Sequence, residues 1–207
     1  MDLFQNKFNK RELITLRTIF NSNSGLYKII NAGISLDEIK SLNQEKLKDL
    51  RFRNCDEVLN KLHNYESFET KAIEIIDWCD NENIFIISIF NEKYPKKLKM
   101  LKNPPCLLFC MGNVNLLSME KSIAVVGSRD VSNYGNIIAK KTTAYFAKNN
   151  INIVSGLAKG VDTQAHKAAI SCKAPTTAVL VDIKDISPPS NLNLAEDIVR
   201  NDGLLVS

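Results

Sequence analysis

Two short loops carry the residues best suited to chemistry, because each combines glycine, serine and a basic side chain. The first is Gly127-Ser128-Arg129, which directly follows the apolar run at 123–126. Glycine allows a tight turn close to a ligand, and an arginine guanidinium can bond two phosphate oxygens at once. A helix predicted to start near Tyr134 would direct its unpaired N–H groups and positive dipole end to the same place. The sequence therefore predicts an anion site here.

The second loop is Ser155-Gly156-Leu157-Ala158-Lys159-Gly160, which follows the apolar run at 151–154. Its two glycines allow successive N–H groups to converge into an anion-binding nest, and its serine and lysine add a hydroxyl and a charge. Asp162 is expected to cap the helix that follows. We assign phosphate binding to seven residues of the two loops: Gly127, Ser128, Arg129, Ser155, Gly156, Lys159 and Gly160.

Features of an enzyme are scarce in the sequence. Neither loop matches the dinucleotide fingerprint or the P-loop. His166 has Asp162 one helical turn before it, so we expect it on a helix surface or at a helix end, with contact to a ligand as the alternative. The five cysteines are irregularly spaced, and no second pair or nearby histidine completes a zinc site. We therefore expect no catalytic residue, no metal and no cofactor.

The elements that must position these loops change in type near residue 83. Residues 1–80 show apolar residues at helical spacing between polar breaks, which predicts a small all-helical domain of the SAM-like or helix-hairpin-helix kind, or else a plain helical adaptor. From residue 84 onward, continuous apolar runs alternate with helical segments. That alternation is typical of an α/β fold with a parallel sheet and helices on both faces.

The pattern also places the individual elements. Helices are expected in the first region at 11–20, 26–31, 36–41, 44–50, 56–62 and 69–81. Strands are expected in the second region at 84–88, 106–111, 123–126, 151–154, 176–181 and 204–206. Helices at 134–148, 162–171 and 192–201 are expected between the last four strands.

Composition and charge limit the class of protein. The 207 residues are 44% hydrophobic and 24% charged, which suffices for a normal core. The sequence contains no run of about 18 consecutive apolar residues, the length needed to span a membrane. Met1–Gln5 also lacks the pattern of a secretion signal, so we expect a cytoplasmic protein. Residues 1–80 hold 12 Lys and Arg against 13 Asp and Glu, whereas residues 81–207 hold 15 against 10. The basic excess lies with the two loops, where it favours polyanions.

Taken together, the motifs resemble those of the DprA family, also called Smf, the DNA-processing proteins of bacterial transformation. Ile123-Ala-Val-Val-Gly-Ser-Arg129 is similar to the first signature of the family, and Ser155-Gly-Leu-Ala-Lys-Gly-Val-Asp162 to the second. Tyr94-Pro95 is similar to part of the segment that precedes them. The resemblance is close over residues 84–172 and loose over residues 173–207.

The resemblance implies a Rossmann-like domain over residues 84–207 that binds single-stranded DNA. It also implies a homodimer that protects incoming DNA, loads the RecA recombinase during natural transformation and is not an enzyme. The helical region at 1–80 fits the SAM-like domain that many members carry in front. By position in the motifs, the resemblance places Arg129 in the anion pocket with Gly127, Ser128, Ser155, Gly156 and Lys159.

Two departures from the family pattern bear on function. After the predicted strand at 176–181 the family usually has a glycine-containing loop and a Tyr-Pro pair, whereas residues 182–190 read Asp-Ile-Lys-Asp-Ile-Ser-Pro-Pro-Ser. Lys184 is the one basic side chain there, and we name it with His166 as a possible secondary contact. The family pattern also continues past Ser207, so we expect the second domain to be truncated at its C-terminus.

Two other functions stay open. One is a nucleotide-binding Rossmann-like enzyme of the phosphoribohydrolase type, which needs an acidic residue in a glycine-rich loop that residues 182–190 do not supply. The other is an inactive truncated DprA remnant that folds but does not bind DNA.

Overall fold

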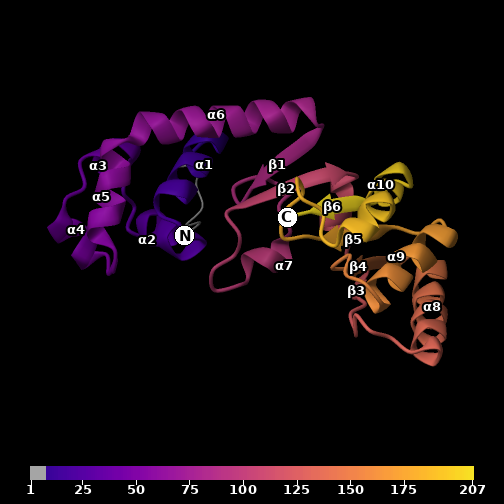
Figure 1. Ribbon diagram of the computed structural model, residues 1–207. Helices are drawn as coiled ribbons and strands as arrows, with labels where there is room; N and C mark the ends of the chain where they lie inside the picture. Colours follow the sequence, from indigo (N-terminus) through magenta and orange to yellow (C-terminus); the bar gives the residue numbers. More distant parts are fainter. Residues whose placement is uncertain (1–7) are drawn as a thin grey trace. The chain divides into compact units, whose positions relative to one another are not determined.

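The computed structural model describes residues 8–207, whose helices and strands are labelled in Figure 1. The segment Met1–Gln5, whose sequence lacks the pattern of a secretion signal, lies outside the described residues. The chain packs as two compact units: Met1–Glu82 with Ile86–Leu107, and Asn83–Phe85 with Leu108–Ser207. The first unit therefore includes residues 86–107, which lie beyond the change of pattern near residue 83.

Helices form most of the first unit, and polar residues at their N-termini decide where they start. Ser35 and Asn43 cap the third and fourth helices, and Ser35 forms a capping box with Glu38. The prediction of an all-helical region before the sheet is confirmed. The helices are α1 (Lys10–Ile19), α2 (Asn23–Asn31), α3 (Leu36–Lys40), α4 (Gln44–Asp49), α5 (Cys55–His63), α6 (Tyr65–Asn81) and α7 (Lys96–Lys99).

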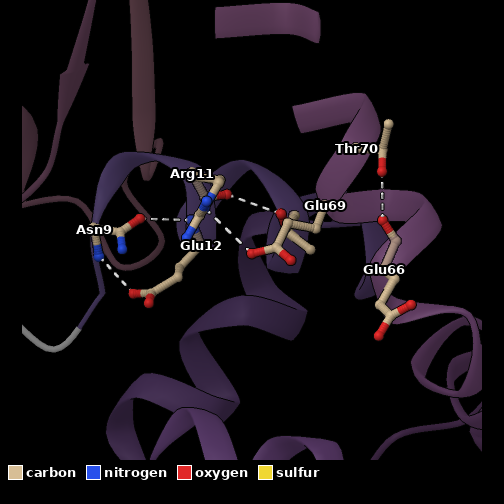
Figure 2. Close-up of polar contacts among 7 residues, drawn as sticks. Asn9, Arg11, Glu12, Glu66, Glu69 and Thr70 are labelled. Atoms are coloured by element: carbon tan, nitrogen blue, oxygen red, sulfur yellow. Dashed lines mark hydrogen bonds and ion pairs between the residues drawn. The ribbon is translucent and has the colours of Figure 1, made fainter. Parts of the chain in front are cut away.

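The start of α1 shows how the local sequence begins a helix (Figure 2). The side-chain oxygen of Asn9 accepts a hydrogen bond from the backbone N–H of Glu12 at 2.9 Å, and the Glu12 carboxylate accepts one from the backbone N–H of Asn9 at 2.7 Å. Arg11 forms an ion pair with Glu69 of α6 at 3.2 Å. The box satisfies two N–H groups that the helix itself leaves unpaired, and the ion pair links α1 to α6.

The sheet has six strands in the order β1-β2-β6-β5-β4-β3. The last four strands in the chain, β3 to β6, are parallel to one another, with Ile123 of β3 beside Ile153 of β4. β2 runs antiparallel to β6, so the sheet is parallel with an antiparallel extension, which is common in α/β proteins. The strands are β1 (Ile84–Ser88), β2 (Leu107–Gly112), β3 (Ser122–Ala124), β4 (Asn152–Ser155), β5 (Thr176–Val179) and β6 (Leu204–Val206).

Three helices connect the parallel strands: α8 (Asn133–Lys148), α9 (Val161–Ser171) and α10 (Leu192–Arg200). The core beneath α8 and α9 is built on the fully buried Ile153 and on alanines of both helices, including Ala147, Ala165 and Ala169. Alanine lets the two helices approach the sheet and each other closely. The predicted α/β fold class is thus confirmed, and the alternating elements bring the loops after β3 and β4 to one edge of the sheet.

The five cysteines are free thiols. Burial raises the pKa of Cys106 to about 11 and that of Cys110 to about 12, which keeps both thiols protonated. No helix within residues 8–207 is both long enough and apolar enough to cross a membrane.

Replacing Asn9 with alanine tests the capping box. The variant loses the hydrogen bond to the Glu12 N–H, so we expect its free energy of unfolding to fall by about 1 kcal/mol in urea denaturation. Asn31→Ala is the matched control, because Asn31 is exposed at the last position of α2 and has no side-chain hydrogen bond within residues 8–207. An equal loss in both variants would contradict the role of the box.

Candidate functional site

A pocket of about 400 Å³ lies at the carboxyl ends of β4 and β5. Ligands of open parallel sheets bind beyond this edge. The fold therefore brings three of the seven predicted residues, Arg129, Gly156 and Lys159, to one pocket. The lining residues are Arg129, Gly156, Ala158, Lys159, Val179, Leu180, Val181, Asp182, Asp185, Ser187 and Pro188.

Two of the predicted glycines do not line the pocket, but they allow the two loops to pack closely against each other. Gly160 has a φ of 80°, and a Cβ atom there would overlap the carbonyl oxygen of Ser128. A Cβ atom on Gly127 would lie 2.7 Å from a methyl carbon of Val161, whose N–H donates a hydrogen bond to the Ser128 carbonyl at 3.2 Å. Any side chain at either position would separate the first loop from the second.

Both predicted serines use their hydroxyl protons within the protein. The Ser128 hydroxyl donates a hydrogen bond to the carbonyl of Asp130 at 2.6 Å and accepts one from the Asp130 N–H at 3.1 Å. The buried Ser155 hydroxyl donates to the carbonyl of Val125 at 2.6 Å, which joins the ends of β3 and β4. The two serines therefore fix the shape of the loops, and neither lines the pocket.

Asp162 occupies the anion nest that the sequence predicted for the second loop. Its Oδ2 atom accepts hydrogen bonds from the N–H groups of Gly156 at 3.0 Å and Ala158 at 3.4 Å. Leu157 between them has a φ of 58°, which turns both N–H groups to the same side. The expectation that Asp162 caps α9 is wrong, since the N-cap is Gly160 and no side chain caps it. Contacts to an external anion must therefore come mainly from side chains.

Asn191, which no sequence motif singles out, holds the second loop in place. Its buried side-chain amide donates to the carbonyls of Leu157 at 2.8 Å and Ala158 at 3.2 Å and lies 2.9 Å from the Thr163 hydroxyl. The segment after residues 182–190 thereby supports the loop that carries Lys159. A polar residue between two prolines and a helix is typical of an exposed loop, so no sequence signal marked this residue.

Charges of both signs line the pocket. Within residues 8–207, neither Arg129 nor Lys159 forms an ion pair. Asp182 and Asp185 line the same pocket, and Asp182 accepts a hydrogen bond from the backbone N–H of Lys184 at 2.8 Å. The Lys184 side chain is not part of the lining. The lining thus has two positive and two negative side chains, which suits a single phosphate better than a triphosphate, because added negative charge would approach the two carboxylates.

His166 is fully buried between α9 and β5, so the expectation of a helix-surface histidine is wrong. Its Nδ1 atom lies 2.8 Å from the Thr176 hydroxyl, which donates its own proton to the carbonyl of Ile153. Nδ1 therefore carries the histidine proton, and Nε2 has no hydrogen-bond partner within the described residues. His166 does not line the pocket.

The protonation of His166 follows from its burial. Burial lowers its pKa to about 4, although the Asp162 carboxylate and the backbone of Ser155 favour the charged form. A neutral, enclosed imidazole fits a structural role in packing α9 on the sheet. Among residues 8–207 there is also no group of three or more His, Cys, Asp or Glu side chains placed to hold a metal ion.

One protein family, described as DNA recombination-mediator protein A, has a model that matches residues 85–207. The chain belongs to this family. The chain is 33% identical over 141 residues to the DNA processing protein DprA of Bacillus subtilis, which covers 68% of this chain and 48% of that protein. It is 40% identical over 120 residues to DprA of Streptococcus pneumoniae, covering 58% and 42% respectively. The matched region thus spans less than half of either DprA relative.

Solved DprA structures show the same fold. DprA from S. pneumoniae matches with a TM-score of 0.76 and 29% identity over 97% of this chain and 68% of that one. DprA from Helicobacter pylori, which was studied for its mode of binding single-stranded DNA, matches with a TM-score of 0.51 and 29% identity over 59% of this chain and 54% of that one. The predicted DprA/Smf family and Rossmann-like fold are confirmed.

The buried histidine makes stability depend on pH. The folded-state pKa of about 4 lies below the ordinary value of 6.5, so the unfolded chain binds more protons between these values. The contribution is fully present above about pH 6.5 and is lost as the pH falls toward 4, by about 3 kcal/mol at most. Urea denaturation at several pH values should show this loss in the parent and in His63→Gln, and a smaller loss in His166→Gln. If the free energy of unfolding depends on pH equally in all three proteins, His166 is not the source of the pH dependence.

Proposed function

We propose that this protein binds single-stranded DNA through the pocket and acts in DNA processing during transformation. The observation that carries the proposal is the pair Arg129 and Lys159, two cations that lack an ion pair within residues 8–207 and line one pocket at the ligand-binding edge of the sheet. Family membership supports it, as does the H. pylori DprA described by its single-stranded DNA binding mode.

The arrangement suits a phosphate of a DNA backbone. The Arg129 guanidinium can bond two phosphate oxygens, and the Lys159 ammonium adds a point charge from the neighbouring loop. Hydrogen bonds to Asp162 and Asn191 hold the second loop before any ligand arrives, so little ordering is needed on binding. Contacts of this kind fix the position of the strand without reading its sequence, and they weaken as salt rises.

The proposal extends to the partners and location of the protein. We propose that it loads the RecA recombinase on the bound strand and protects that strand, that it works as a homodimer, and that it does so in the cytoplasm. The family's description as a recombination mediator supports the link to a recombinase. Dimerisation and location rest on family resemblance.

Replacing Arg129 with alanine is the direct test of the pocket. Loss of a charge-assisted phosphate contact should weaken binding of an oligo-dT strand by about 1–3 kcal/mol. The slope of log K against log salt concentration should become shallower by the amount that corresponds to about one lost phosphate contact. Strands of different sequence should be affected alike. Fluorescence anisotropy across a salt series measures both quantities.

Arg200→Ala is the matched control for this test. Arg200 lies in the same unit but pairs with Glu196 at 2.5 Å and Asp197 at 3.0 Å on the surface of α10, away from the pocket lining. It should bind DNA as the parent does. If Arg129→Ala and Arg200→Ala bind equally well at every salt concentration, the pocket is not the DNA site.

A nucleotide hydrolase is the second candidate, because Asp182 and Asp185 bring carboxylates to the pocket beside Arg129. We propose binding without catalysis, since the pocket lining contains no histidine or cysteine and His166 is enclosed elsewhere. Incubation with each nucleoside monophosphate, followed by chromatography, should release no free base. Release that is abolished by Asp185→Asn would establish the hydrolase instead.

A further inference from the structure

The outward face of α8 carries a stripe of aromatic and basic side chains that does not belong to the pocket. Tyr134, Ile138, Lys141, Tyr145 and Lys148 recur at alternating intervals of four and three residues, which places them in one narrow sector of a helix with 3.6 residues per turn. We call these five residues the α8 stripe. All five are exposed, with 73% of Tyr134 and 68% of Tyr145 open to solvent.

Tyr145 is exposed and contacts one neighbouring ring. Its ring packs edge-to-face against Phe146, with the ring centroids 5.5 Å apart and the planes at 75°. Phe146 in turn packs against the core cluster that contains Ile153. The Tyr145 ring therefore has one contact that leads to the core, while most of its surface stays open to solvent and is accessible for stacking.

The charge of α8 indicates what could cover the stripe. The helix contains three lysines and no aspartate or glutamate, and none of the three lysines forms an ion pair within residues 8–207. Two of these lysines, Lys141 and Lys148, alternate with the rings along the stripe. A chain in which negative charges alternate with flat aromatic groups complements this pattern, and a single nucleic-acid strand with unpaired bases is such a chain.

The position of the stripe connects it with the pocket. Ser132 caps α8, so Tyr134 lies in the first turn after the loop that carries Arg129. Tyr134 and Tyr145 are eleven residues apart, or about 16 Å along the helix axis at 1.5 Å per residue. A strand with one phosphate at Arg129 would meet the stripe at its Tyr134 end.

We propose that the α8 stripe is a second contact surface for single-stranded DNA, on which bases stack against Tyr134 and Tyr145 and phosphates pair with Lys141 and Lys148. This inference rests on the proposed function and extends it from one phosphate site to a track. Duplex DNA does not offer its bases for stacking, so the stripe favours single strands over duplexes.

The test compares Tyr145→Ala with Tyr145→Phe, using fluorescein-labelled oligo-dT of about 16 nucleotides, which is the upper end of the site sizes known for OB-fold single-strand binders. Tyr145→Ala removes the ring and should weaken binding about 5- to 100-fold, while Tyr145→Phe keeps the ring and should bind as the parent does. The salt dependence should be unchanged in both, because no charge is lost. Lys141→Ala should make the slope of log K against log salt concentration shallower by the amount that corresponds to about one lost phosphate contact.

The outcomes separate the stripe from the pocket. If Tyr145→Ala and Tyr134→Ala both bind like the parent while Arg129→Ala is weakened, the stripe proposal is overturned and the pocket stands. If Ile138→Asp dissociates an oligomer and the tyrosine variants bind DNA normally, the stripe is a protein interface and the proposal is again overturned. If the parent does not bind the strand at all, the proposed function fails and the stripe with it.

Discussion

The candidate site depends on one internal interaction, the hydrogen bonds that the Asp162 carboxylate accepts from the loop after β4. A loop with two N–H groups turned to one side attracts an anion, and here the protein supplies that anion itself. The bonds fix the backbone from Gly156 to Ala158 and leave Lys159, the next residue, exposed at the pocket. These two backbone N–H groups are therefore occupied, so an external anion would have to bind mainly to side chains.

The other contacts around the pocket also hold the loop after β4 in one conformation. Gly127 and Gly160 let the two loops approach each other, and Asn191 holds the second loop from its other side. Such a loop changes little when a ligand binds, which lowers the entropic cost of binding. The arrangement explains why two signature motifs distant in the sequence act as one unit, although only Arg129, Gly156 and Lys159 line the pocket.

Local sequence predicted those features of the fold that depend on local physics. Helical spacing located the helices apart from the short α7, and the caps of α3 and α4 by Ser35 and Asn43 are equally local, because a capping bond spans only three residues. Asp162 and His166 were misplaced, because their surroundings are decided by how α9 packs on the sheet. The antiparallel pairing of β2 with β6 is likewise a tertiary property, since the two strands lie almost one hundred residues apart.

The balance of charge in the pocket bears on how such a protein could bind a long strand. Arg129 and Lys159 line the same pocket as Asp182 and Asp185, whose negative charges offset theirs. The pocket alone therefore offers one phosphate only a small net attraction. Single-strand binders gain affinity by adding many weak contacts along the backbone and bases. α8 has three lysines and no acidic residue, and it begins where the Arg129 loop ends. The motif that carries Arg129 thus also sets where α8 begins, the helix from which we propose that the contact extends.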